Sequence, residues 1–533
     1  MVDEAHERSL SSDVLLGVLK KIRKKRPDLR IVIASATLDA ENFLRFFTSS
    51  TDADQNGSKE IGKIVSVEGR AFPVDTHYLS EPCEDYLERA IKTIFDIHSS
   101  ESIGDILVFL TGRDEIETAL EMIADRLPSL PKDAHRLLPL PLYAGLSTEQ
   151  QMYVFEAAPE QTRKVILATN IAEASVTIDG IVYVIDSGFV KLRAYNPQTG
   201  IETLTATPVS KASATQRAGR AGRTKPGKCY RLYTEAACSN LPDATVPEIQ
   251  RSNLAPTILQ LKALGIDNIA RFDFLTPPPA ELIIRALELL YSLGALDDYA
   301  KLTNPLGTRM AELALEPMLA KCLLSAPSFG CLSEMLTIAA MISLQGNVWF
   351  SHDAKKAEET ARRKFAVEEG DHLTLLNVYQ AFITKGKKEA KWCQQHYLNF
   401  KSLTRAVSIR NQLRRYLERF GIDVSESLSS TSSASPIIKV GGMPMQEKIR
   451  RCLTSGYFAH AAKMAADGSF RTADGGTVLH VHPSSLMFNR KAEWVGFTEI
   501  MEMKGKVFIR DVSKIEKGWL REYGGGYYRL KGS

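Results

Sequence analysis

The sequence predicts a multi-domain protein in which an α/β portion with a parallel sheet precedes a largely helical half and a small β domain. At 533 residues the chain exceeds one hydrophobic core, since a domain takes roughly 100 to 200 residues. Up to about residue 245, β-branched apolar runs alternate with amphipathic helical stretches, a pattern typical of βαβ units. From about residue 250 the apolar periodicity is helical, and alternating runs return only near the end.

Composition excludes several classes of protein. Hydrophobic residues make up 44% of the chain and charged residues 24%, as in ordinary folded proteins. No apolar run approaches the roughly 18 residues that cross a bilayer, so we expect no membrane partner. The beginning of the chain has no signal-peptide pattern, which predicts an intracellular protein. The net charge of +4 is compatible with a nucleic-acid partner but does not prove one, and seven scattered cysteines without a C-x-x-C pair argue against disulfides or zinc.

The elements follow in order along the chain. A helix is expected over 10–26 and a buried strand over 29–34. Further strands are expected over 63–67, 105–110, 139–143, 164–168, 181–186 and 228–233, with helices over 84–98, 113–127 and 147–158. Helices then dominate 252–264, 280–293, 317–344 and 368–418. The polar, low-complexity residues 425–436 predict a flexible linker, and alternating runs at 477–482 and 505–512 predict the closing β domain.

An acidic pair lies at the beginning of the chain, in Val2-Asp3-Glu4-Ala5-His6. Hydrolysis of a nucleoside triphosphate needs one carboxylate for the magnesium shell and one to orient and deprotonate water. An Asp-Glu pair is also an ordinary preference at a helix start, so the pair alone leaves both interpretations open. The tripeptide Ser35-Ala36-Thr37 follows an apolar run, and its small hydroxyls suit a loop that couples phosphate state to domain position.

A more specific motif is Gln216-Arg217-Ala218-Gly219-Arg220-Ala221-Gly222-Arg223. On a helix, Gln216, Arg220 and Arg223 would share one face, where two guanidinium groups could clamp a γ-phosphate and the amide could touch water. The glycines at 219 and 222 would permit close approach of another domain. The alternative is a solvated basic helix, which the acidic pair elsewhere in the chain disfavours.

Two further segments carry candidate contacts. Residues 168–180 are a strand end that opens into a polar loop, suited to phosphate or ribose contact or simply to capping a helix. Residues 188–210 contain two alternating runs about Asn196-Pro197-Gln198-Thr199-Gly200, which predict a β-hairpin.

In this order and at this spacing, these segments resemble the DEAH-box RNA helicases of superfamily 2, from Met1 to about residue 520. The resemblance implies RecA-like domains, the first only partial, then a winged helix, a helical ratchet bundle and an OB-like β-barrel. The implied bounds are 1–50 for the remnant of the first RecA-like domain, 60–245 for the second, 250–316 for the winged helix, 317–420 for the bundle, 421–436 for a linker and 437–525 for the OB-like fold. Such proteins use ATP hydrolysis to move 3′ to 5′ on RNA, opening duplexes or stripping bound protein.

The resemblance also assigns roles around the phosphates. It implies that Asp3 holds the water shell of Mg²⁺ together with Glu4, and that Glu4 is the catalytic base. His6 would contact the γ-phosphate or another domain. Ser35 and Thr37 would couple the two RecA-like domains.

Other matched positions would touch the water, the nucleoside and the RNA. Gln216 matches the water-orienting amide, and Arg220 and Arg223 match the arginine fingers. Asp179 matches the acid that contacts the ribose, and Phe155 matches the aromatic that stacks on the base, unless it is merely core. Thr169 and Asn170 match residues that contact the RNA backbone. The resemblance also implies that the hairpin expected within 188–210 faces RNA, unless it is an ordinary edge ribbon.

The sequence departs from the family at the phosphate-binding loop, because no G-x-x-x-x-G-K-[ST] segment occurs in it. We therefore expect an amino-terminally incomplete sequence whose residues 1–50 do not fold stably by themselves and whose parent chain is the active helicase. The alternative is a genuine short product that binds RNA or a helicase partner without catalysis. Expected partners are RNA, a glycine-rich-patch activator and a ribonucleoprotein complex such as the spliceosome, in the nucleus or nucleolus or, alternatively, the cytoplasm.

Overall fold

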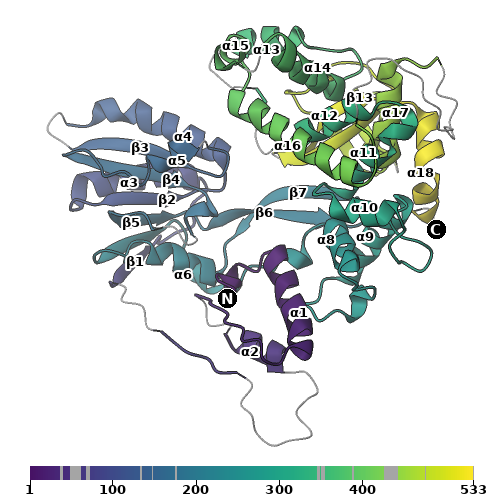
Figure 1. Cartoon of the computed structure of the whole chain (residues 1–533). Coiled ribbons are helices and arrows are strands. Elements are labelled where there is room, and N and C mark those ends of the chain that lie inside the picture. The colour runs from purple at the N-terminus through teal and green to yellow at the C-terminus, as the bar shows by residue number, and fades with distance from the viewer. Residues whose placement is uncertain are drawn as a thin grey trace, which may run out of the picture. The chain divides into compact units, whose positions relative to one another are not determined.

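A computed structural model describes residues 1–36, 40–48, 62–67, 72–131, 135–146, 148–173, 177–344, 348–349, 355–386, 389–424, 442–473, 476–503 and 505–531. The chain divides into two compact units, each of which is described by itself (Figure 1). The first comprises Met1–Arg193, Leu204–Arg251 and Asp273–Pro277, and the second comprises Ala194–Thr203, Ser252–Phe272 and Pro278–Ser533. Among these described residues, no helix combines the length and the apolar character that a membrane span requires.

The first unit is built on one parallel sheet, as predicted. Its strand order is β1-β8-β5-β2-β4-β3, and every neighbouring pair is parallel. The strands are β1 (Val74–Tyr78), β2 (Asp105–Phe109), β3 (Arg136–Leu142), β4 (Thr162–Ala168), β5 (Ile181–Asp186) and β8 (Gly227–Arg231). The prediction of a strand over 63–67 is wrong, since these residues form no ladder and Val67 is 86% exposed. A β-branched run becomes a strand only where a partner and a packed face are available.

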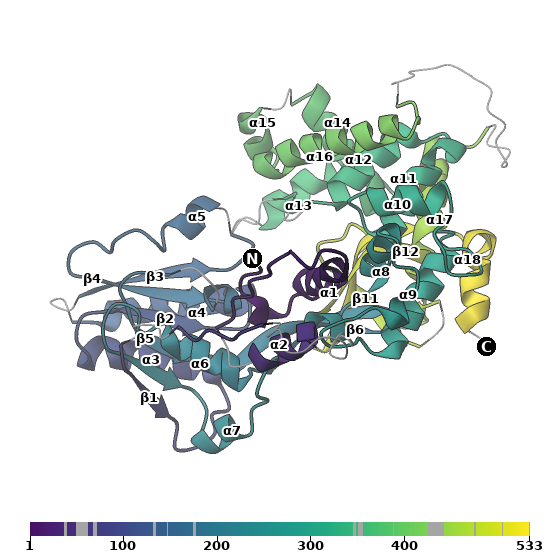
Figure 2. The same ribbon diagram turned by 60° about the horizontal axis from the view of Figure 1, so that its bottom comes forward.

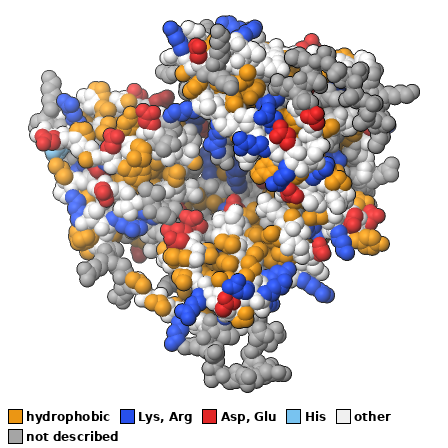
Figure 3. All heavy atoms as spheres, viewed as in Figure 1, with side chains coloured by type: hydrophobic (Ala, Val, Ile, Leu, Met, Phe, Trp, Pro, Cys, Tyr) orange, Lys and Arg blue, Asp and Glu red, His pale blue; other side chains and the backbone are white. Residues whose placement is uncertain are grey.

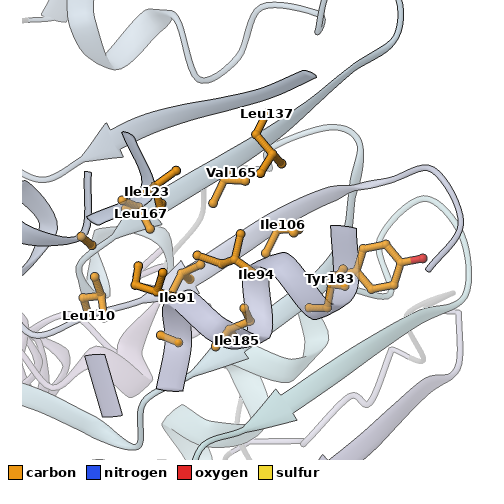
Figure 4. Packing of buried hydrophobic residues seen from close by; sticks show 14 of the residues in the cluster. Ile91, Ile94, Ile106, Leu110, Ile123, Leu137, Val165, Leu167, Tyr183 and Ile185 are labelled. Carbon is orange, nitrogen blue, oxygen red and sulfur yellow. The ribbon is translucent and has the colours of Figure 1, made fainter. Parts of the chain in front are cut away.

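The first unit also contains helices, of which those at 86–100, 113–126 and 211–219 supply buried residues to the core of the sheet. The helices are α3 (Tyr86–Ser100), α4 (Arg113–Arg126), α5 (Thr148–Met152), α6 (Lys211–Gly219) and α7 (Glu235–Ser239). Helix α3 begins where the Asp85 side chain accepts hydrogen bonds from the backbone N–H groups of Leu87 and Glu88. Its isoleucines at 91, 94 and 97 then share one face and pack against β2, β4 and β5 (Figure 4). Burial of each such side chain contributes about 1.5–3 kcal/mol.

The amino-terminal segment forms a small substructure within the first unit. It contains the short helix η1 (Ala5–Glu7) and the helices α1 (Leu10–Lys25) and α2 (Ala40–Thr48), which lie side by side in Figures 1 and 2. The strand predicted over 29–34 is reduced to a single parallel bridge between Val2 and Ile33. Leu16, Phe43 and Phe46 are buried together, and the partly buried Leu275 packs against them. The core of this substructure therefore includes residues far along the chain.

The second unit begins with helices of the expected winged-helix region. These are α8 (Ala255–Ala263), α9 (Ala280–Ser292) and α10 (Leu306–Glu312). The bundle that follows contains α11 (Pro317–Phe329), α12 (Leu332–Ile342), α13 (Lys355–Arg363), α14 (Asp371–Thr384), α15 (Ala390–Gln395) and α16 (Phe400–Arg419). The helix predicted over 317–344 is two helices, because Gly330 takes a φ of 65° and ends α11. The predicted hairpin is confirmed as β6 (Phe189–Asn196) and β7 (Ile201–Pro208), which pair only with each other.

A closed β-barrel completes the second unit and confirms the predicted β domain. Its strands run in the order β10-β11-β13-β12-β9. Their bounds are β9 (Ala461–Met464), β10 (Phe470–Thr472), β11 (Val478–Val481), β12 (Trp494–Met503) and β13 (Lys506–Lys514), with α17 (Met445–Tyr457) before and α18 (Lys517–Lys531) after them. The predicted linker at 425–436 lies outside the described residues. Acidic and basic side chains are interspersed over the visible surface, in keeping with the small net charge (Figure 3).

The amino-terminal core can be tested on two adjacent leucines of α1. Leu16 is fully buried, whereas Leu15 is 45% exposed. We expect Leu16→Ala to lower the local unfolding free energy by about 2–5 kcal/mol, because it leaves a cavity. Leu15→Ala should change it by less than about 1 kcal/mol. Amide hydrogen exchange of α1 measures both, and equal protection in the two variants would contradict the packing described.

Candidate functional site

The acidic segment follows the single β-bridge at Val2 and forms a tight turn. Asp3 is exposed, and its Oδ1 accepts the N–H of Glu4 at 2.9 Å. Glu4 has a φ of 49°, a left-handed conformation that costs a non-glycine residue roughly 1–2 kcal/mol. The chain then returns to the bridge, where Ala5 donates to the carbonyl of Ala34 at 3.0 Å. The turn thus directs two consecutive carboxylates away from the strand end.

His6 connects the acidic pair to the hydroxyl-bearing loop. Its Nδ1 accepts the N–H of Ala36 at 3.2 Å, so the ring proton lies on Nε2. Nε2 faces Glu4 Oε2 at 3.3 Å. Ser35 is half-buried beside this bond, while Thr37 lies outside the described residues. A displacement of the Ser35-Ala36 loop would therefore reorient the Glu4 carboxylate through one imidazole.

The arginine motif departs from the predicted helix. Helix α6 ends at Gly219, so Gln216 lies in its last turn, Arg220 caps it and Arg223 lies beyond it. The prediction that one helix face carries all three side chains is wrong. Beyond the helix, Gly222 packs against the segment that leads into β1, since a Cβ at Gly222 would lie 2.5 Å from the Phe72 carbonyl oxygen. The close contact at Gly222 is therefore with the sheet of its own unit. An added Cβ at Gly219 would meet no atom within 4 Å.

Arg220 and Arg223 nevertheless lie close enough to interact. Arg220 is buried and donates to the carbonyl of Glu173, whereas Arg223 is exposed. Burial lowers the pKa of Arg220, the charge of Arg223 lowers it further, and the carboxylate of Glu4 opposes both effects. Two neighbouring guanidinium groups repel each other, and an anion between them relieves the repulsion. The structure thus brings both arginines and Glu4 into one electrostatic neighbourhood.

Arg217, quoted in the motif but given no role from sequence, is the most extensively bonded residue described here. It is fully buried, and its guanidinium donates to Glu173 Oε1 at 2.6 Å and to Asp186 Oδ1 at 2.7 Å. It also donates to the Phe189 carbonyl at 3.2 Å. Asp186 is fully buried as well, and Tyr233 donates to its second oxygen at 2.9 Å. The available signal was that Arg217 is adjacent to Gln216 on a helix and so lies on a different face from it.

The predicted nucleoside and RNA contacts are accessible. Phe155 is 37% exposed, so it is not simply a core residue, and Asp179 is exposed. The residues before them, Val154 and Ile178, are buried in one cluster. At the carboxyl end of β4, Thr169 is half-buried and donates its N–H to Leu142 at 3.1 Å, and Asn170 is exposed.

The buried ion network predicts a large asymmetry between neighbouring arginines. Arg217→Met keeps most of the volume but leaves Glu173 and Asp186 without their cation, which should cost about 3–5 kcal/mol of stability. Arg223→Met removes an exposed charge and should cost no more than about 0.5 kcal/mol. Urea unfolding measures the free energy of unfolding of both variants. A small loss of stability in Arg217→Met would contradict the network.

Family models match four consecutive parts of the chain. The helicase conserved C-terminal domain matches residues 87–225. The winged-helix and ratchet-like parts of the helicase-associated HA2 domain match 286–315 and 316–375. The oligonucleotide/oligosaccharide-binding fold matches 449–527. The predicted fold class, with a RecA-like domain, a winged helix, a ratchet bundle and an OB-like barrel, is confirmed.

Curated relatives are similar over almost the whole chain. The probable ATP-dependent RNA helicase DHX35 of Homo sapiens is 50% identical over 532 residues, which cover 99% of this chain and 73% of the relative. The protein of the same name from Pongo abelii is also 50% identical, with 71% of it covered. The homolog from Caenorhabditis elegans is 48% identical, with 70% of it covered. From its acidic segment to its OB fold, the chain belongs to the DEAH-box RNA helicase family.

Proposed function

We propose that this chain provides the water-activating and arginine-finger parts of an ATP-driven motor that moves 3′ to 5′ on RNA and remodels ribonucleoprotein. The observation that carries the proposal is the arrangement of Glu4, His6 and Arg220. One imidazole ties Glu4 to the Ser35-Ala36 loop, and Arg220 is held where the charge of Glu4 acts on it. Phosphoryl transfer depends mainly on such positioned charges.

In this proposal Glu4 orients and deprotonates the attacking water, with Gln216 as a second contact to that water. Arg220 and Arg223 balance the charge that develops on the γ-phosphate. Asp3 fits a role in the outer shell of Mg²⁺, because its exposed carboxylate uses one oxygen for the Glu4 N–H and keeps further lone pairs for water. Mg²⁺ held through water by Asp3 and Glu4 would supply positive charge to neutralise the phosphate oxygens.

The proposed RNA contacts fix position without reading sequence. Thr169 and Asn170 lie at the carboxyl end of β4, at the start of the loop that also carries Glu173. Hydroxyl and amide groups at such a place suit phosphate oxygens of the RNA backbone. The relatives carry the name of RNA helicases, and one part of the chain matches an oligonucleotide-binding fold. A glycine-rich-patch activator, a spliceosomal complex and a nuclear or nucleolar location complete the proposal.

A second candidate function rests on the absence of a Gly-x-x-x-x-Gly-Lys-[Ser/Thr] segment from the 533 residues. Backbone amides and the lysine of that loop hold the β- and γ-phosphates in this family. A polypeptide without that loop would bind RNA or a helicase partner but would not hydrolyse ATP. We favour the motor, with the loop supplied in the same polypeptide. The reason is that the buried hydrogen bonds of Arg217 and Arg220, which hold the proposed arginine finger, are present.

The proposed role of Glu4 as general base is tested by Glu4→Gln in a polypeptide that carries this chain together with a phosphate-binding segment. Loss of a general base should reduce RNA-stimulated kcat by about 10²-fold or more. RNA affinity should be unchanged. Glu41→Gln, on the exposed face of α2, is the matched control and should leave both quantities as they are. A Glu4→Gln variant with more than a tenth of the normal rate would exclude the assigned role.

The two candidate functions differ in what the 533 residues do alone. We expect them to bind single-stranded RNA in a fluorescence-anisotropy titration but to hydrolyse ATP at background rates, with or without RNA. The polypeptide with the phosphate-binding segment should hydrolyse ATP in an RNA-dependent way. Equal turnover by both would refute the requirement for the loop, and no turnover by either would favour the scaffold.

A further inference from the structure

One buried lysine holds the turn that carries Phe155. The chain leaves α5 at Met152, and Phe155 donates its N–H to the Met152 carbonyl at 2.9 Å. Lys164, on β4, donates its ammonium to the Val154 carbonyl at 3.0 Å and to the Glu156 carbonyl at 2.8 Å. The carbonyl groups of the residues before and after Phe155 thus bind the same cation. This bonding also ends α5 well before residue 158, to which the helix was predicted to extend.

The ammonium of Lys164 has no donor left for a ligand. Its side chain is 3% exposed, and its third direction faces Asp105 Oδ2 at 3.8 Å. An ammonium has three donors; here two bind carbonyls, and the Asp105 carboxylate lies within ion-pair distance of the charge. Lys164 therefore acts through the turn that it holds, not as a phosphate ligand.

Asp105, the partner of Lys164, shapes the turn that follows Asp179. Its Oδ1 accepts the backbone N–H of Lys164 at 2.8 Å, and its own N–H donates to the Gly180 carbonyl at 2.9 Å. Gly180 has a φ of 89°, and a Cβ there would lie 2.7 Å from Asp105 Oδ2. Only glycine fits between this carboxylate and the chain, so Asp179 leaves the turn in a set direction.

We propose that Lys164 and Asp105 are a positioning pair that presents Phe155 and Asp179 together to the base and ribose of a nucleoside triphosphate. Val154 and Ile178, the residues before them, share one buried cluster with Ile166 and Ile181. The proposal rests on the proposed function for the roles of Phe155 and Asp179. Stacking on an aromatic ring tolerates every base, so the pair sets affinity for nucleotides in general.

The test is a double-mutant cycle in the polypeptide that carries a phosphate-binding segment. Loss of base stacking changes an affinity by roughly tenfold. Phe155→Ala and Lys164→Met should each raise KM for ATP by about that factor and leave kcat within about twofold. The double variant should show no further rise, because both changes remove one contact. Lys225→Met is the matched control: its exposed ammonium also acts on Asp105 but binds only the Ile103 carbonyl, so KM should not move.

Additive effects of Phe155→Ala and Lys164→Met on KM would overturn the proposal, as would a fall in kcat without a rise in KM. If Lys164→Met does not fold, Asp105→Asn keeps the shape and removes the charge, and it should raise KM several-fold at unchanged kcat. An unchanged KM in that variant overturns the pairing. The proposed function is tested separately. It would be refuted if Glu4→Gln did not lower kcat, whatever KM values these variants show.

Discussion

Arg217 lies without solvent contact between the carboxylates of Glu173 and Asp186, and the functional loops of the first unit are connected through it. Glu173 also supplies the carbonyl that Arg220 binds, and Arg217 reaches the Phe189 carbonyl where β6 begins. A buried ion is tolerated only when its geometry and hydrogen bonds are nearly complete. Arg220, the loop after β4 and the start of the hairpin are therefore connected through one guanidinium.

Like charges face each other on both sides of the proposed catalytic centre. Burial and the charge of Arg223 lower the pKa of Arg220, and burial together with Glu4 and Glu173 raises the pKa of Glu7. A magnesium–triphosphate complex held there would supply negative charge to the arginines and positive charge to the carboxylates. Such a ligand would relieve both repulsions at once, so the arrangement favours the complex over either ion alone.

How much the sequence predicts depends on whether the relevant contact is local. Strand β5 has the predicted bounds, because a central parallel strand is buried on both faces and is continuously apolar. Strand β1 was missed, since Val-Asp-Thr-His-Tyr is a half-exposed edge strand with little apolar signal. The motif spacing predicted Arg220 and Arg223, but not that Gly222 meets Phe72, a contact far apart in sequence. Lys164 and Asp105 belong to no sequence motif, so the sequence did not predict their role.

The buried pairs explain why exposed contact residues keep a fixed geometry. Replacing a buried ion pair by apolar groups of similar volume is often neutral or stabilising, so Arg217–Asp186 and Lys164–Asp105 are not required for stability as such. An apolar side chain, however, cannot bind the carbonyls of Val154, Glu156 or Phe189, whose direction sets each turn. These pairs hold the two turns in one conformation, so Phe155 and Arg220 would act in their proposed roles without reordering first.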